Sequence, residues 1–106
     1  MNIQQFEAML AQGRDSALLR FGLGKLHLDA GDAQQAVLHL SKCLEQDPHY
    51  SAAWNLLGKA HLEAGDAEAA RQTWEKGIAT AQEKGDVQAA KMMTVFLNRL
   101  NKTSGA

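Results

Sequence analysis

Apolar side chains recur at spacings of three and four residues along this chain, and the alternation typical of strands is nearly absent. Such spacing places apolar residues on one face of an α-helix. Three Gly-Asp pairs, at 31–32, 65–66 and 85–86, interrupt the pattern. A glycine can end one helix in the left-handed conformation, and an aspartate can cap the next. The pattern therefore predicts six helices, at about 2–12, 16–30, 33–46, 50–64, 67–84 and 87–101.

The chain also repeats itself at an interval of 34 residues. Ten of the 14 positions from Leu23 to Ala36 are identical to the positions 34 residues later, from Leu57 to Ala70. A period between 20 and 50 residues is typical of solenoids, in which stacked helical or strand units bury a continuous core. Solenoids mostly bind other proteins, so the repeat favours a binding function over a catalytic one.

Residue types within each unit carry a more specific signal. From Arg20 the first unit reads R-x2-L-G-x2-H, then A-x3-L and a proline; from Trp54 the second reads W-x2-L-G-x2-H, then A-x3-W. Both resemble the tetratricopeptide repeat, whose pattern is W-x2-L-G-x2-Y, A-x3-F and P. The sequence departs from this pattern in three ways. Arg20 stands in place of the first tryptophan, His27 and His61 stand in place of the tyrosine, and Gln82 stands in place of the second proline. Gly24 and Gly58 are expected to let the two helices of a unit approach closely.

The resemblance implies an all-α fold of antiparallel helix hairpins, stacked as a short right-handed solenoid in a small two-repeat protein of bacterial type. Extending the period backwards places Phe6 where Leu40 and Trp74 stand, so the chain is expected to begin with the second helix of a truncated repeat. The expected organisation is one domain, 1–106, with a partial repeat at 2–12, repeat 1 at 17–50, repeat 2 at 51–84, a capping helix at 85–101 and a disordered tail at 102–106.

Composition and charge narrow the function classes. With 106 residues, 45% of them hydrophobic, the chain can bury one core without a metal or disulfide. The net charge is −1, from 11 basic and 12 acidic residues without long runs, which argues against nucleic-acid binding. The single cysteine excludes an internal disulfide. Neither a secretory signal nor an apolar run of about 20 residues occurs, so we expect a cytoplasmic protein without a membrane partner.

The resemblance also locates a candidate site. In this family the first helices of successive units line a concave groove that holds an extended peptide or a partner helix. Lys25, Asn55 and Lys59 can hold a carboxylate there through charge-assisted hydrogen bonds. Alternatively, the two lysines are solvated and pair with acidic residues four positions on, Asp29 and Glu63. The candidate partner-binding residues are Phe21, Lys25, Leu28, Asn55, Lys59, Leu62 and Glu63.

Histidines and a cysteine raise the alternative of a metal site. His39 and Cys43 lie four residues apart, and His27 and His61 are equivalent in the two units, which suits zinc ligands from converging helices. However, Cys43 stands where the family has a small packed residue, and the equivalent histidines stand where it has a half-buried tyrosine. No GxSxG, HExxH, P-loop or paired CxxC motif occurs. We therefore expect no metal, no cofactor and no catalytic activity.

The last predicted helix is more apolar than a cap requires. Its apolar residues fill an arc of roughly 160°, whereas a helix that covers one core needs about 100°. Methionine suits adaptable contacts, so the candidate interface residues are Met92, Met93, Val95 and Phe96. Alternatively, the preceding helix covers this surface. The favoured function is a non-catalytic protein–protein interaction module or scaffold; the alternative is a structural protein that forms a weak homodimer through this helix.

Overall fold

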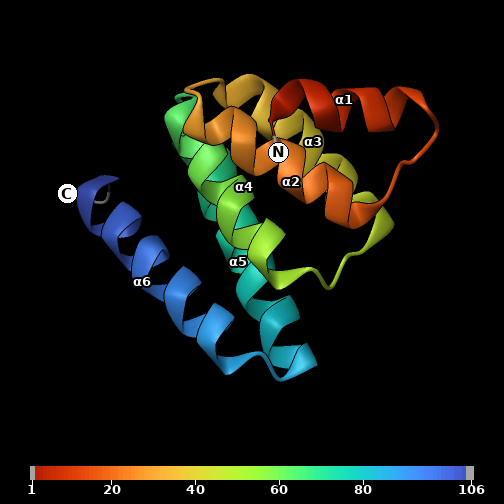
Figure 1. The fold of residues 1–106 in the computed structure, drawn as a ribbon. Helices are drawn as coiled ribbons and strands as arrows, with labels where there is room; N and C mark the ends of the chain where they lie inside the picture. The colour runs from red at the N-terminus through yellow and green to blue at the C-terminus, as the bar shows by residue number, and fades with distance from the viewer. Residues whose placement is uncertain (1, 105–106) are drawn as a thin grey trace.

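The computed structural model describes residues 2–104, which fold into six α-helices without a strand (Figure 1). Consecutive helices pack as antiparallel neighbours, and α6 packs on both α5 and α4. The two terminal helices lie at opposite ends of the stack. The predicted all-α helical repeat solenoid is therefore confirmed. The helices are α1 (Ile3–Ala11), α2 (Ala17–Asp29), α3 (Ala33–Gln46), α4 (Ser51–Glu63), α5 (Ala67–Lys84) and α6 (Val87–Ser104).

The predicted helix boundaries agree with the structure within about one residue, except at the end of α6. A disordered tail was expected from residue 102, but α6 continues through Ser104, so the prediction is wrong for 102–104. No proline between residues 87 and 104 interrupts the main-chain hydrogen bonds of the helix. Near its end, the Thr103 hydroxyl donates to the carbonyl oxygen of Arg99 at 2.9 Å. Residues 105 and 106 of the expected tail lie outside the described residues. The division into repeats 17–50 and 51–84 stays a prediction.

Each Gly-Asp pair forms the turn between two helices, as predicted. Gly31, Gly65 and Gly85 have φ angles of 84°, 87° and 83°, in the left-handed region that favours glycine. Each following aspartate accepts a hydrogen bond from a main-chain N–H in the first turn of the next helix. These caps join Asp32 to Gln35 (3.2 Å), Asp66 to Ala69 (3.0 Å) and Asp86 to Ala89 (3.1 Å).

Removing one of these caps tests their contribution. Asp66→Ala leaves the Ala69 N–H without its side-chain acceptor and is expected to lower the free energy of unfolding by about 1 kcal/mol. Asp66→Asn keeps an acceptor oxygen and is expected to stay close to the unsubstituted protein. Urea denaturation followed by circular dichroism measures both variants. Equal losses for the two would show that the charge, rather than the hydrogen bond, is what stabilises the helix start.

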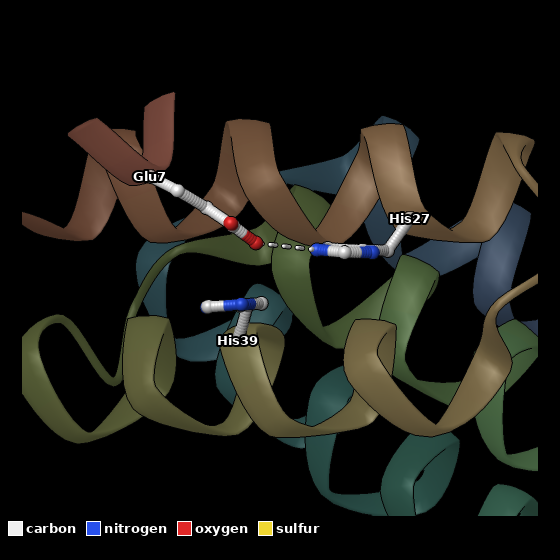
Figure 2. A group of neighbouring side chains, drawn as sticks. All are labelled: Glu7, His27 and His39. Carbon is white, nitrogen blue, oxygen red and sulfur yellow. Dashed lines mark ion pairs between the residues drawn. The ribbon is translucent and has the colours of Figure 1, made fainter. Parts of the chain in front are cut away.

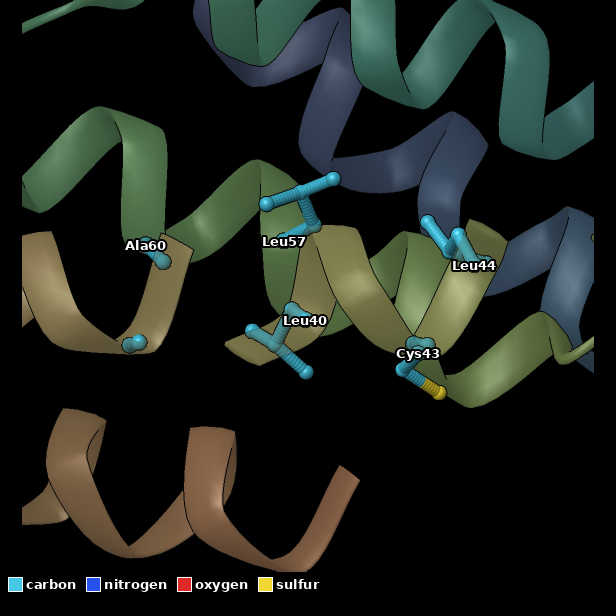
Figure 3. Packing of buried hydrophobic residues seen from close by; sticks show 7 residues of the cluster. Leu40, Cys43, Leu44, Leu57 and Ala60 are labelled. Carbon is cyan, nitrogen blue, oxygen red and sulfur yellow. The ribbon is translucent and has the colours of Figure 1, made fainter. Parts of the chain in front are cut away.

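Two apolar clusters form the core. The first joins α3 to α4 and includes Leu40, Cys43, Leu44, Leu57 and Ala60 (Figure 3). The second joins α5 to α6 around Trp74 and Met93, and Trp54 packs against both clusters. Burial raises the pKa of the Cys43 thiol to about 11, with a smaller contribution from the charge of Asp47. Cys43 is therefore a protonated core thiol, a poor metal ligand and a poor nucleophile at neutral pH.

The mid-helix glycines allow close packing within each unit, as expected from the sequence. A Cβ atom added to Gly24 would lie 2.5 Å from Cγ of Leu40, and one added to Gly58 would overlap the indole ring of Trp74. Leu40 and Trp74 are 0% and 1% exposed. Each unit therefore packs the large side chain of its second helix directly onto the backbone of its first helix.

Candidate functional site

The groove residues on α2 divide between the surface and the core. Lys25 is exposed, and its Nζ lies 3.4 Å from Oδ2 of Asp29 four residues on. Phe21 is half-buried and stacks on Tyr50 with ring centroids 4.9 Å apart. Leu28 is half-buried against the first core cluster. On this helix, Lys25 is thus the candidate most available to a partner.

Two of the groove residues on α4, Asn55 and Lys59, contact α6. The side-chain amide of Asn55 lies 3.1 Å from the sulfur of Met92, a weak acceptor, and its Oδ1 is buried without a hydrogen-bond partner. Lys59 places Nζ 4.5 Å from the ring centroid of Phe96. Leu62 is 43% exposed, and Glu63 is exposed as well. The alternative in which each lysine pairs with an acidic residue four positions later therefore holds for Lys25, which pairs with Asp29. Lys59 instead lies over the ring of Phe96.

The candidate interface on α6 is partly core. Met93 is 0% exposed and packs against Gly77, where an added Cβ would lie 2.6 Å from its sulfur. Its prediction as an interface residue is wrong, because the missing side chain of Gly77 lets α5 cover it. Phe96 is half-buried and stacks on Trp74, with centroids 5.7 Å apart. Met92 and Val95, in contrast, are 50% and 47% exposed.

A cluster that the sequence did not predict joins α1 to the first hairpin (Figure 2). Ligand atoms of Glu7, His27 and His39 all lie within 4.8 Å of one another. Nε2 of His27 is buried and lies 3.5 Å from the Glu7 carboxylate, beyond a good hydrogen bond. The two imidazoles stack with centroids 5.3 Å apart. The only available signal was the partial-repeat character of residues 2–12, which places α1 against α2.

Arg20 argues against a metal ion at this cluster. Its Nη1 lies 3.1 Å from Nδ1 of His39. Because a guanidinium only donates, this Nδ1 accepts, and the neutral ring carries its proton on Nε2. Neither nitrogen of His39 then offers a free lone pair to a metal. Burial, and next the charge of Arg20, lower the pKa of His39, which favours this neutral form.

Arg20, which stands at the tryptophan position of the repeat pattern, also binds the loop before α2. Its guanidinium donates two hydrogen bonds to the carboxylate of Asp15, each 2.9 Å long. Gln46 donates a third hydrogen bond to Asp15 at 2.8 Å. The hydrogen bond from Arg20, followed by that from Gln46, lowers the pKa of Asp15 to about 2. The hydrogen bonds of Asp15 to Arg20 and Gln46 therefore connect the α1–α2 loop to both helices of the first hairpin, α2 and α3.

Apolar grooves lie at the two ends of the solenoid. The N-terminal groove, of about 550 Å³, lies between α1 and α2, and the C-terminal groove, of about 630 Å³, lies between the end of α5 and α6. Leu18 beside the first is 71% exposed, and Val87 beside the second is 60% exposed. The apolar linings include Phe6, Met9, Leu18, Phe21 and Gly22 at the N-terminal end, and Gly85, Val87, Ala90 and Val95 at the C-terminal end.

This geometry defines a helical repeat protein with an apolar groove near each of its two terminal helices. A model of the family "Tetratricopeptide repeat" matches residues 27–93. The TPR repeat-containing protein PA0015 of Pseudomonas aeruginosa is 62% identical over 102 residues, which is 96% of this chain and 97% of that protein. The chain belongs to the tetratricopeptide repeat family.

Two solved structures share the fold. The solution structure of BPP2914 from Bordetella parapertussis has a TM-score of 0.85 at 48% identity and covers 95% of this chain and 88% of that one. A crystal structure of a tetratricopeptide repeat domain protein from Salinibacter ruber has a TM-score of 0.76 at 23% identity, over 83% and 98% of the two chains. At that identity, the second likeness concerns the fold alone.

Membership of the family defines the general class of function. Tetratricopeptide repeats generally mediate protein–protein interaction, and their proteins are generally non-enzymatic scaffolds. Across residues 2–104, no helix is both long enough and apolar enough to cross a membrane.

Proposed function

We propose that this chain is a non-catalytic interaction module that binds an acidic peptide or partner helix along its concave face. The observation that carries the proposal is a pair of cations around one aromatic ring. Lys59 Nζ and Arg99 Cζ lie 4.5 and 5.9 Å from the ring centroid of Phe96. In the described part of the chain, neither cation forms an ion pair with a carboxylate. A partner carboxylate placed between them would form charge-assisted hydrogen bonds with both.

An apolar hollow adjoins this cationic pair. It has a volume of about 330 Å³ and is lined in part by Leu62, Trp74, Phe96 and Leu100. Together they favour a partner segment with an acidic residue next to a large apolar one. The proposal keeps Lys25 on α2 as a second basic contact. The remaining candidates, Phe21, Leu28, Asn55 and Glu63, stay predicted partner contacts. Because so short a groove immobilises few partner residues, we expect an affinity on the order of micromolar.

Charge reversal tests the concave face. Lys25→Glu/Lys59→Glu is expected to weaken binding of acidic peptides, selected from a display library against the unsubstituted chain, by about tenfold or more, since a favourable charge becomes repulsive. Isothermal titration calorimetry at low and high salt measures the change, which is expected to shrink as salt rises.

The matched control is Lys76→Glu, which reverses an exposed lysine on α5. It is expected to bind the same peptides with nearly unchanged affinity. Equal affinity of the double variant and the control for every selected peptide would contradict the proposed concave site.

A further inference from the structure

An exposed ridge on α6 alternates apolar and basic side chains. It consists of Val87, Lys91, Val95 and Arg99, each four residues after the last. Residues at this interval form a continuous row on a helix surface, and the row extends for about 18 Å along α6. The two valines are 60% and 47% exposed, and both basic residues are exposed as well. An exposed apolar surface edged by charge is typical of a site for a protein partner.

A hollow lies on each side of this ridge. One is the C-terminal groove, of about 630 Å³, between the end of α5 and α6. The other has a volume of about 330 Å³ and lies on α6 itself, lined in part by Met92 and Phe96. Lys91 and Val95 line both hollows and therefore separate them. A ridge between two hollows is the shape onto which the side-chain rows of a second helix pack.

The charge on α6 has one sign. The helix contains Lys91, Arg99 and Lys102 and no acidic residue, although the whole chain has a net charge of −1. Within residues 2–104, none of these three cations forms an ion pair with a carboxylate. A complementary partner is therefore acidic. The ridge of a second copy is not complementary, because two α6 ridges in contact would bring like charges together.

Main-chain chemistry favours a helical partner over an extended peptide. The N–H and C=O groups of α6 pair within the helix, so the ridge presents side chains and no strand edge. An extended peptide on this ridge would leave its own main-chain groups facing apolar side chains without hydrogen-bond partners. A helix satisfies its main-chain groups internally. Its side chains also recur at intervals of three and four, which suits the spacing of the ridge and of the two hollows.

We propose that α6 is the docking surface for an acidic amphipathic helix of a partner protein, which lies along the ridge from Val87 to Arg99. Apolar residues of the partner fill the hollows on both sides of Val95, and its carboxylates bind Lys91 and Arg99 through charge-assisted hydrogen bonds. The inference rests on the proposed function, because Arg99 also belongs to the cationic pair around Phe96. It deepens that function by naming the partner as a helix and by extending the site along α6.

Isothermal titration calorimetry of the full chain with helical peptides tests the proposal. The probes are peptides of about 18 residues, selected from a display library in which one helical face carries glutamates and varied apolar residues at intervals of three and four. The selected peptide is expected to bind with a Kd on the order of 10–100 µM and to gain helix on binding, measured by circular dichroism. The same peptide with a central proline, or with lysines in place of its glutamates, is expected to bind at least about tenfold more weakly.

Variants of the ridge locate the bound helix. Lys91→Glu and Val95→Glu are each expected to weaken binding of the selected peptide by about tenfold or more, since each places a carboxylate against an acidic partner. The matched controls are Lys76→Glu on α5 and Leu38→Glu on α3, which alter an exposed lysine and an exposed leucine away from the ridge. Both controls are expected to bind with nearly unchanged affinity. Circular dichroism confirms that each variant is folded, as expected for exposed positions.

The outcomes separate this proposal from the proposed function. If Lys25→Glu/Lys59→Glu loses binding while Lys91→Glu and Val95→Glu retain it, the concave site stands and the α6 ridge is wrong. The reverse pattern supports the ridge and contradicts the concave site. A library that yields no binder, or equal binding of the helical and proline peptides, would overturn the helical partner. Self-association of the chain in sedimentation equilibrium that Val95→Glu abolishes would also overturn it, because a second copy would then occupy the ridge.

Discussion

Replacing Trp74 by alanine is expected to lower the free energy of unfolding by about 3–5 kcal/mol. The side chain is 1% exposed and links three helices. It lies over Gly58 on α4, stacks on Phe96 on α6, and donates from Nε1 to the carbonyl oxygen of Asn55 at 3.1 Å. Alanine would remove these contacts and leave a cavity that the flanking helices cannot fill. Because domains of this size are stable by about 5–15 kcal/mol, the variant is expected to be marginal.

Urea denaturation followed by circular dichroism measures this loss, and Leu38→Ala serves as the control. Leu38 is a large apolar residue on a helix as well, but it is 46% exposed and is expected to cost less than about 1 kcal/mol. A loss at Trp74 no larger than that at Leu38 would mean that the indole does not hold α4, α5 and α6 together.

The sequence predicts the helices well because their ends depend on local chemistry. Gly65 and Asp66, for example, end α4 and begin α5 through a left-handed glycine and a capping carboxylate, both visible in a dipeptide. The end of α6 has no such dipeptide within the described residues, and there the prediction failed. The contact between Gly58 and Trp74 was also predictable, because two units repeat the same spacing of a glycine and a large side chain.

The candidate site was less predictable, because it depends on how helices pack in three dimensions. An apolar arc on α6 does not reveal that Met93 faces the bare backbone of Gly77 and is buried, whereas its neighbour Met92 is exposed. The position of Lys59 over Phe96 depends in the same way on the register between α4 and α6. The approach of Glu7 to His27 requires the docking of a partial repeat, for which the chain contains no second example.

Gly58→Ala is expected to destabilise the protein by about 1–3 kcal/mol, although alanine is the better helix former by about 1 kcal/mol. The added methyl group would overlap the indole of Trp74, and a buried ring stacked on Phe96 has no free space into which to move. Helix propensity acts on α4 alone, whereas the overlap acts on the packing of α4 against α5. Packing dominates because the atoms that would meet the methyl group belong to a rigid ring rather than to a flexible side chain.

The same substitution is expected to change sign in the Trp74→Ala background. There the clashing ring is absent, so Gly58→Ala should restore about 0.5–1 kcal/mol of stability through helix propensity and partial filling of the cavity. The double-mutant cycle, measured by urea denaturation of the four proteins, should give a coupling free energy of about 1.5–4 kcal/mol. Additive effects would contradict the close approach of α4 and α5. Coupling of this size would show that the glycine of the repeat pattern is retained for helix packing despite its cost to the helix that contains it.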